Sequence, residues 1–300
     1  MADNTNSKKP RDFSELMIIA NKKVAEANAK IAEKSEQKAS KPEQMFLPGM
    51  DEFMRAMPNH IARSSLFAPV ARGPKKNHHQ TVLVTRDDAV ITYSGMQLDE
   101  AQADAWMQLV HEAKDSELGT PVTMVRADFL KAMGRATSGQ NYEWLHKVMF
   151  AFTAAVIVIE IRKPDGTQKH KIGHTKAFHM LSDFEYDAVA EVYSFTIDPR
   201  WKVLFGNREY ALVDWRKRLQ IGRGQDMAKA LQRLVATSSD QVQRFALEWL
   251  KEKLQYAGRM RDFEDALEKA MRELERLEIL VGGRLEISTK RKPQAVWTKL

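Results

Sequence analysis

The chain has 300 residues, no cysteine, 43% hydrophobic residues and a formal net charge of +7. These values are typical of a globular protein with two domains of ordinary size. They exclude disulfide frameworks, thiol nucleophiles and cysteine-ligated metal sites. No segment approaches the roughly 20 apolar residues of a membrane-spanning helix, and Leu16–Ala20 is too short for a signal-peptide core. We therefore expect a cytoplasmic protein with no membrane partner.

The basic residues are concentrated at the two ends of the chain. Residues 1–80 carry 14 Lys and Arg against 9 Asp and Glu, and the last 13 residues carry four bases and no acid. The region between them is nearly neutral. Phosphate contacts supply most of the non-specific affinity for nucleic acid, so any contact with DNA must come from local basic patches.

Residues 1–43 are rich in Ala, Lys, Glu, Asn and Ser. Apolar residues at helical spacing from Leu16 to Ile31 are compatible with a solitary helix, whereas the composition favours a flexible solvated arm. Both interpretations stay open. For residues 44–80 we predict an extended segment held by apolar anchors.

Residues 81–212 form a first predicted domain. Its expected elements, in chain order, are a hairpin of 82–85 with 89–93, a helix begun by the capping box of Asp99 and Gln102, a strand at 122–125, helices at 127–133 and 140–152, and hairpins at 156–162 and at 176–184 with 192–197.

Residues 213–224 are predicted to be a basic linker, and residues 225–300 a second domain. That domain has expected helices at 225–236, 248–256 and 261–278, followed by a hairpin of 279–288 with 295–299. Helix, strand, two helices and a hairpin is the order of a winged helix. The sequence therefore predicts an α+β fold with two tandem winged-helix domains after the flexible or helical N-terminal arm.

Four stretches point to a known family: Met54–Asn59, Arg63–Phe67, Val90–Gly95 and Phe178–Phe205. They resemble the signature segments of the TrfA family of plasmid replication initiators, over about residues 44–300. The resemblance implies a bacterial, plasmid-associated protein that binds tandem direct repeats (iterons) in double-stranded origin DNA. It also implies opening of the adjacent DNA, recruitment of the host DnaA, replicative helicase and sliding clamp, and self-association to a dimer.

The family reaches the sliding clamp through a short motif before its first winged helix. Gln44, Met45 and Leu47 match that motif, whereas Phe46 and Pro48 depart from it. An extended peptide of this kind places its amide and apolar side chains in a pocket of the partner. The alternative is a strap that packs on its own domain.

In the second domain the predicted third helix is the candidate for the major groove. Arg261, Asp265, Glu268 and Arg272 fall on its outward face, and Arg259 leads into it. Seven acids between Asp262 and Glu278 oppose a helix lying along phosphates. Either only the N-terminal end enters the groove, or other elements carry the contact, above all the basic hairpin residues Lys290, Arg291 and Lys292. The alternative for these three is a solubilising turn.

In the first domain the entry to the helix at 140–152 offers polar groups for phosphate or base edges. The candidates there are Arg135, Ser138, Gln140, Asn141 and Lys147. Between Arg162 and Lys176 the bases outnumber the acids, and we interpret this stretch as a basic wing with Lys163, Lys169 and Lys171 as phosphate contacts.

Catalytic signatures are missing. The stretch from Gly134 to Gly139 lacks the Lys and Ser or Thr of a phosphate-binding loop, and His78-His79-Gln80 does not supply the metal-binding spacing of nicking initiators. The basic neighbours of His170, His174 and His179 oppose a metal site. We expect no enzyme, no metal and no cofactor. A winged-helix transcriptional regulator is the main alternative function, and a relaxase or a scaffold without DNA contact are weaker ones.

Overall fold

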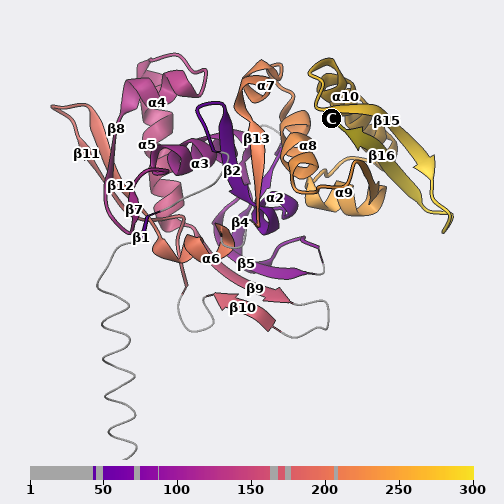
Figure 1. Ribbon diagram of the computed structural model, residues 1–300, viewed down its shortest axis with the longest axis horizontal. Helices are drawn as coiled ribbons and strands as arrows, with labels where there is room; N and C mark the ends of the chain where they lie inside the picture. Colours follow the sequence, from indigo (N-terminus) through magenta and orange to yellow (C-terminus); the bar gives the residue numbers. More distant parts are fainter. Residues whose placement is uncertain are drawn as a thin grey trace, which may run out of the picture. The chain divides into compact units, whose positions relative to one another are not determined.

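The computed structural model describes residues 43–44, 50–70, 75–86, 88–162, 168–172, 177–205 and 209–300, with only the backbone at 43–44, 118, 162 and 168–172 (Figure 1). Gln44–Leu300 forms one compact unit. None of the described helices is both long and apolar enough to cross a membrane. The unit mixes helices with antiparallel sheets, so the predicted combination of both element types is confirmed.

The segment after residue 50 is more regular than expected. It forms strand β2 (Met54–Pro58), helix α2 (Asn59–Arg63) and strand β3 (Phe67–Ala68). Strand β2 pairs antiparallel with β13 (Tyr210–Asp214), and β3 pairs parallel with β6 (Leu98–Asp99). Ile61, Leu66 and Phe67 are fully buried. The apolar residues of this segment are therefore part of the main hydrophobic core.

A four-stranded sheet follows, in the order β10-β9-β5-β4. Its strands are β4 (Asn77–Val82), β5 (Ala89–Met96), β9 (Val156–Arg162) and β10 (Gln168–Ile172). The hairpin predicted at 82–85 exists, but its first strand ends at Val82, and Thr85 Oγ1 donates to the Ala89 carbonyl across the turn (2.6 Å). Strand β9 pairs with β5 over Ala89–Ser94, so the β9–β10 hairpin belongs to this sheet.

We call residues 100–197 without this hairpin the first repeat. It contains α3 (Glu100–Glu112), β8 (Val122–Val125), α4 (Arg126–Ala132), α5 (Gly139–Ala154), β11 (Leu181–Asp187) and β12 (Val192–Ile197). The predicted capping box is present, because Asp99 Oδ1 accepts from Gln102 N (2.9 Å) and Gln102 Oε1 accepts from Asp99 N (3.0 Å). Strand β12 pairs with both β11 and β8.

Residues 226–299 form the second repeat, with the same order of elements. They are α8 (Asp226–Ala236), β14 (Val242–Ala246), α9 (Leu247–Lys253), α10 (Met260–Arg276), β15 (Leu280–Ile287) and β16 (Pro293–Lys299). Strand β16 pairs with both β15 and β14. In both repeats the first strand leads straight into a short helix and pairs with the second strand of the hairpin. Strand β14 is the one element of the second repeat that its sequence did not predict.

The stretch predicted as a basic linker is a helix, α7 (Trp215–Gln220), capped by Asp214, whose Oδ1 accepts from Lys217 N (3.0 Å). The remaining short elements are β1 (Glu43–Gln44), β7 (Glu117–Leu118), the 3-10 turn Pro199–Trp201 and α6 (Lys202–Phe205). Helix α7 connects β13 to the second repeat and carries the fully buried Arg218.

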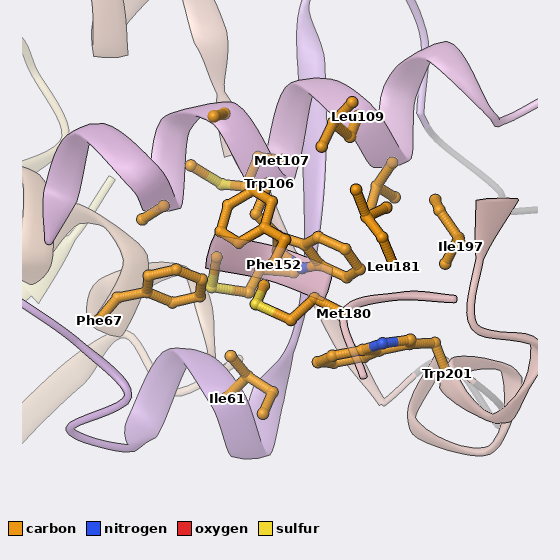
Figure 2. Close-up of a cluster of buried hydrophobic side chains, with 14 of the residues drawn as sticks. Ile61, Phe67, Trp106, Met107, Leu109, Phe152, Met180, Leu181, Ile197 and Trp201 are labelled. Carbon is orange, nitrogen blue, oxygen red and sulfur yellow. The ribbon is translucent and has the colours of Figure 1, made fainter. Parts of the chain in front are cut away.

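The buried apolar side chains form two clusters. The larger one runs from Met50 to Trp215 and is centred on Trp106, whose ring lies 5.9 Å from that of Phe152 and 4.7 Å from that of Trp201 (Figure 2). The smaller one runs from Ile221 to Trp297 and includes Phe245, which stacks on Trp297 at 5.2 Å. Each repeat therefore packs on its own core.

Buried ion pairs join the two repeats. Glu100 of α3 accepts hydrogen bonds from Arg233 of α8 and from Arg218 (3.0 Å), and all three side chains are almost completely buried. Asp104 accepts from Arg218 (2.7 Å) and Lys229 (2.6 Å), and the positive charges of both hold its pKa below the ordinary value even though burial acts to raise it. Removal of one member would leave an unpaired buried charge.

Candidate nucleic-acid interface

Helix α10 of the second repeat presents a basic stripe to solvent. Its exposed charged positions follow each other at steps of three and four residues, which places them on one face. They are Arg261, Asp265, Lys269, Arg272 and Arg276. The opposite face is apolar, with Phe263, Leu267 and Leu274 fully buried. Four of the five exposed charges are therefore basic, although the helix as a whole is rich in acids.

Three acids of α10 are hydrogen-bonded within the protein, and a fourth, Glu268, pairs with Arg272 of the stripe (3.7 Å). Asp262 pairs with Arg259 (3.0 Å), Glu273 accepts from Arg276 (2.8 Å) and from Gly222 N (2.9 Å), and Glu275 accepts from Gly283 N (2.8 Å). The hydrogen bonds from Arg276 and then from Gly222 lower the pKa of Glu273 to about 2. These carboxylates support the helix start, the preceding turn and the hairpin. The acid content of α10 thus does not oppose a phosphate backbone as strongly as its sequence indicates.

The C-terminal hairpin β15–β16 is fixed against α10 and then projects past the helices of the second repeat (Figure 1). Gly283 makes the close approach possible, because a Cβ there would lie 3.0 Å from Met271 Cβ. Beyond this point Lys290, Arg291 and Lys292 are all exposed. No acid follows Glu286 in the chain, so the end of the hairpin carries an uncompensated positive charge.

The entry to α5 in the first repeat is polar but largely self-satisfied. Ser138 caps the helix by accepting from Asn141 N (3.4 Å), and Asn141 donates to the Ala136 carbonyl (2.7 Å). Arg135 donates to Asn141 Oδ1 (3.1 Å) and lies 3.6 Å above the Trp144 ring, and burial lowers its pKa. Gln140 and Lys147 are exposed. Of the predicted contacts here, these two and Ser138 face solvent.

The hairpin that follows α5 in the first repeat, β11–β12, is acidic. Asp183, Glu185, Asp187 and Glu191 are exposed on it, and residues 181–198 contain no base. Glu191 pairs with Arg126, whose guanidinium lies 3.9 Å above the Tyr142 ring. Two backbone amides, Ala190 and then Val189, lower the pKa of Asp187. A hairpin with this charge repels phosphate.

Other predicted site residues lie in a different sheet from the one expected, or outside the described residues. The basic wing of the first domain was predicted between Arg162 and Lys176. Strands β9 and β10, which carry the described part of this stretch, belong to the β10-β9-β5-β4 sheet and not to the sheet of the first repeat. Lys163 lies outside the described residues, and only the backbone is described for Lys169 and Lys171 on β10. Gln44 ends strand β1. The other candidate clamp-motif residues, Met45, Leu47 and Pro48, lie outside the described part.

The second repeat brings its predicted residues together with two that were missed. Arg259 is 86% exposed before α10, and Arg261 and Arg272 lie along the stripe. Lys269 and Arg276 complete it, and both could have been found by extending the Arg261–Asp265 spacing through the whole helix. Among the described residues no group of three His, Cys, Asp or Glu side chains could hold a metal ion.

Known proteins resemble this chain at several levels. The chain matches the family described as TrfA protein over residues 18–243. It is 26% identical over 170 residues to the plasmid replication initiator protein TrfA of Escherichia coli, covering 55% of this chain but only 42% of that relative's length. Domains 2 and 3 of RctB have a TM-score of 0.50 at 14% identity, with 81% of this chain and 97% of that chain covered.

A structure of the Pi initiator protein in complex with iteron DNA gives a TM-score of 0.47 at 14% identity, covering 67% of this chain and 94% of that chain. The likeness to the RctB domains shows a shared fold. The family match extends over well more than half of the chain, and the chain belongs to the TrfA protein family.

Proposed function

We propose that this protein initiates plasmid replication by binding tandem direct repeats (iterons) in origin duplex DNA, chiefly through its second repeat. The observation that carries the proposal is the basic stripe of α10 beside a basic hairpin, with Glu273 and Glu275 of the helix hydrogen-bonded within the protein. The initiator role of the TrfA relative supports it. The protein acts by binding, without catalysis, cofactor or metal, in the bacterial cytoplasm and on the plasmid.

Each repeat is a winged helix in this proposal, so that the protein has two such domains in tandem. Support comes from the identical element order and from the shared strand pairing, in which the first strand joins the hairpin. The proposed domains are residues 81–212 and 225–300, joined by residues 213–224. Two separate hydrophobic clusters support a division into two domains, and the larger cluster also includes apolar residues of 50–67 and Trp215.

Helix α10 lies in the major groove in this arrangement, as the third helix of such domains does. Arg261 and Arg272 read base edges, where a bidentate contact to guanine contributes about 1–3 kcal/mol of discrimination. Lys290, Arg291 and Lys292 contact phosphates. The first repeat adds weaker contacts from Ser138, Gln140 and Lys147 at the entry to α5 and along its outward face.

Further partners follow from the family resemblance. Origin opening, recruitment of DnaA and of the replicative helicase, and a monomer–dimer equilibrium are parts of the proposal. Gln44–Pro48 is the candidate contact with the sliding clamp. A transcriptional regulator with the same domains would bind DNA equally well, but it would lack clamp binding. Clamp capture by the full chain, lost on Gln44→Ala, therefore separates the two functions.

Fluorescence anisotropy of the full chain tests the DNA-binding claim. The probes are labelled duplexes tiled across the replicon that encodes the protein, at about 0.15 M salt. We expect tight binding confined to tiles that contain tandem direct repeats. Equal and weak binding to every tile, or no binding, would overturn the proposed function and favour the scaffold alternative.

A further inference from the structure

The end of the C-terminal hairpin carries an apolar pair with no protein to cover it. Ile287 is 65% exposed, and its cross-strand partner Pro293 is also exposed. Alternate residues of a strand share a face, so Ile287 continues the row of Leu285, which packs against the smaller core cluster. The apolar face of the hairpin thus extends beyond the core into solvent.

The turn that presents this pair is closed by its own hydrogen bonds. Ser288 N donates to the Lys292 carbonyl (2.9 Å), Arg291 N donates to the Ser288 carbonyl (2.8 Å), and Lys292 N donates to Ser288 Oγ (3.1 Å). Arg291 takes a left-handed conformation at φ 56° to complete the turn. The end of the hairpin is therefore preorganised, and little ordering entropy would be lost when it inserts into a partner.

The charges around the pair select the partner. Lys290, Arg291 and Lys292 are exposed within the turn itself. No acid lies between Ile287 and the C-terminus. Glu286, next to Ile287, is held by Arg284 (3.0 Å) and Gln294 (2.9 Å). An apolar pair beside three exposed bases fits a polyanion that also offers an apolar gap. Proteins that bend DNA insert side chains such as Ile and Pro between base steps from the minor groove, with Arg and Lys beside them on the backbone.

We infer that Ile287 and Pro293 form a wedge that enters the minor groove next to the α10 contact, separates one base step and bends the duplex. This deepens the proposed function, on which it rests, by assigning to the hairpin a deformation of DNA in addition to phosphate contacts. Flexible pyrimidine–purine steps such as TA yield most easily to such a wedge.

The test uses the full-length protein and duplexes of its own direct repeats that carry 2-aminopurine at successive positions. The fluorescence of this base analogue rises when it unstacks, and donor and acceptor dyes at the duplex ends report the bend. We expect one step to brighten by about threefold or more on binding and the dye ends to approach each other. Ile287→Ser should abolish the brightening and reduce the bend, while affinity falls by about tenfold or less.

Val281→Ser is the matched control, because Val281 is 49% exposed on the same strand but at its other end. It should behave as wild type. Saturated wild-type binding with no brightened step, or equal brightening with Ile287→Ser, would overturn the wedge and leave the proposed function standing. Failure of the wild type to bind any repeat duplex would overturn the proposed function and the wedge together. Ile287-dependent binding to vesicles of phosphatidylserine and phosphatidylcholine, without unstacking, would assign the hairpin to a lipid surface instead.

Discussion

The two repeats share a chain path and differ in surface charge. Both run from a helix through a strand and two helices to a hairpin, and in both the first strand pairs with the second hairpin strand. The first hairpin, β11–β12, bears four exposed acids, whereas the end of the second, β15–β16, bears three exposed bases. The core positions specify the path, and the exposed positions are free to give each repeat a different partner.

The long helices differ in the same way. The outward positions of α5 include Gln140, Glu143, Lys147 and the 65% exposed Phe150, which together carry no net charge. Two arginines near α5 lie on aromatic rings, Arg126 on Tyr142 and Arg135 on Trp144. In α10 the basic side chains are exposed, although Arg272 pairs with Glu268 (3.7 Å) and Arg276 with Glu273 (2.8 Å). The number of arginines near a helix is therefore a poor guide to DNA binding until their partners are known.

Loss of a buried ion pair between the two repeats should have the largest destabilising effect. Glu100→Gln removes the carboxylate that pairs with Arg218 and Arg233, both fully buried. Because the buried Arg233 loses the carboxylate it pairs with and Arg218 keeps only Asp104, we expect the free energy of unfolding to fall by about 3–5 kcal/mol. Urea titration measures this. Asp128→Asn, at an exposed pair with Lys131, is the control and should cost less than about 1 kcal/mol. A similar cost for both variants would contradict the role given to the junction.

A new acid at equivalent positions of the two helices sharpens the comparison. Arg261 and Gln140 are each the second residue of their helix, α10 and α5, and both are exposed. Arg261→Glu should weaken binding to the repeat duplex about 100-fold, because a base contact is lost and an acid faces phosphate. Gln140→Glu should weaken it by less than about threefold. Anisotropy titrations measure both affinities. A larger loss for Gln140→Glu than for Arg261→Glu would place the main DNA contact on the first repeat.

Loss of the bases at the end of the C-terminal hairpin should weaken binding to all DNA sequences alike. The triple change Lys290→Ala, Arg291→Ala and Lys292→Ala should weaken specific and non-specific duplexes by a similar factor of about ten. It should also reduce the slope of log affinity against log salt by about 3, close to one unit for each phosphate contact. Anisotropy between about 0.05 and 0.2 M salt measures both quantities. An unchanged slope would show that the turn serves only solubility.

The short helices of the two repeats, α4 and α9, differ in a buried lysine at the end of α9. Lys253 ends α9, fully buried with Nζ 3.2 Å from the Ser64 carbonyl, whereas Ala132 ends α4. Burial lowers the pKa of Lys253 from 10.5 to about 7. Between these values the unfolded chain binds more protons, so this group makes stability rise with pH across that window.

Lys253→Met should therefore stabilise the protein by about 3–5 kcal/mol below pH 7, where the folded state otherwise buries a charge, and the gain should vanish toward pH 10.5. Urea midpoints at several pH values measure it. Lys251→Met, at a half-buried position of the same helix, is the control and should keep the wild-type pH profile. A gain that does not depend on pH would contradict the assignment to Lys253.

Local patterns predicted the helices well and the long-range pairings poorly. The capping box at Asp99 and the periodicity of α10 depend on neighbouring residues, so the sequence shows them directly. The stretch between Arg162 and Lys176 was predicted as a wing because its bases and the turn before it are local features, but the sheet of β9 and β10 is set by pairing with β5, more than 60 residues earlier. Which sheet a hairpin joins cannot be read from its own residues.

The burial and the ion-pair partners of charged residues were equally hard to predict. Arg218 was predicted to be part of a basic linker, yet its side chain is buried against Glu100 and Asp104, which accept its hydrogen bonds. Both acids lie more than 100 residues away in the sequence, so local patterns do not reveal them. Conversely, Glu273 and Glu275 counted against DNA binding by α10, yet they accept hydrogen bonds from the turn and the hairpin. Net charge along a helix omits these partners.

The central claim is that the second repeat faces the duplex and the first hairpin does not. Because the chain contains no cysteine, a single cysteine can carry a DNA-cleaving reagent at any chosen place. Lys269→Cys lies on the exposed stripe of α10, and Val189→Cys lies at the end of the β11–β12 hairpin, where the native side chain is 97% exposed. The account predicts cleavage within each direct repeat from position 269 and none from position 189. Strong cleavage from position 189, with none from 269, would contradict it.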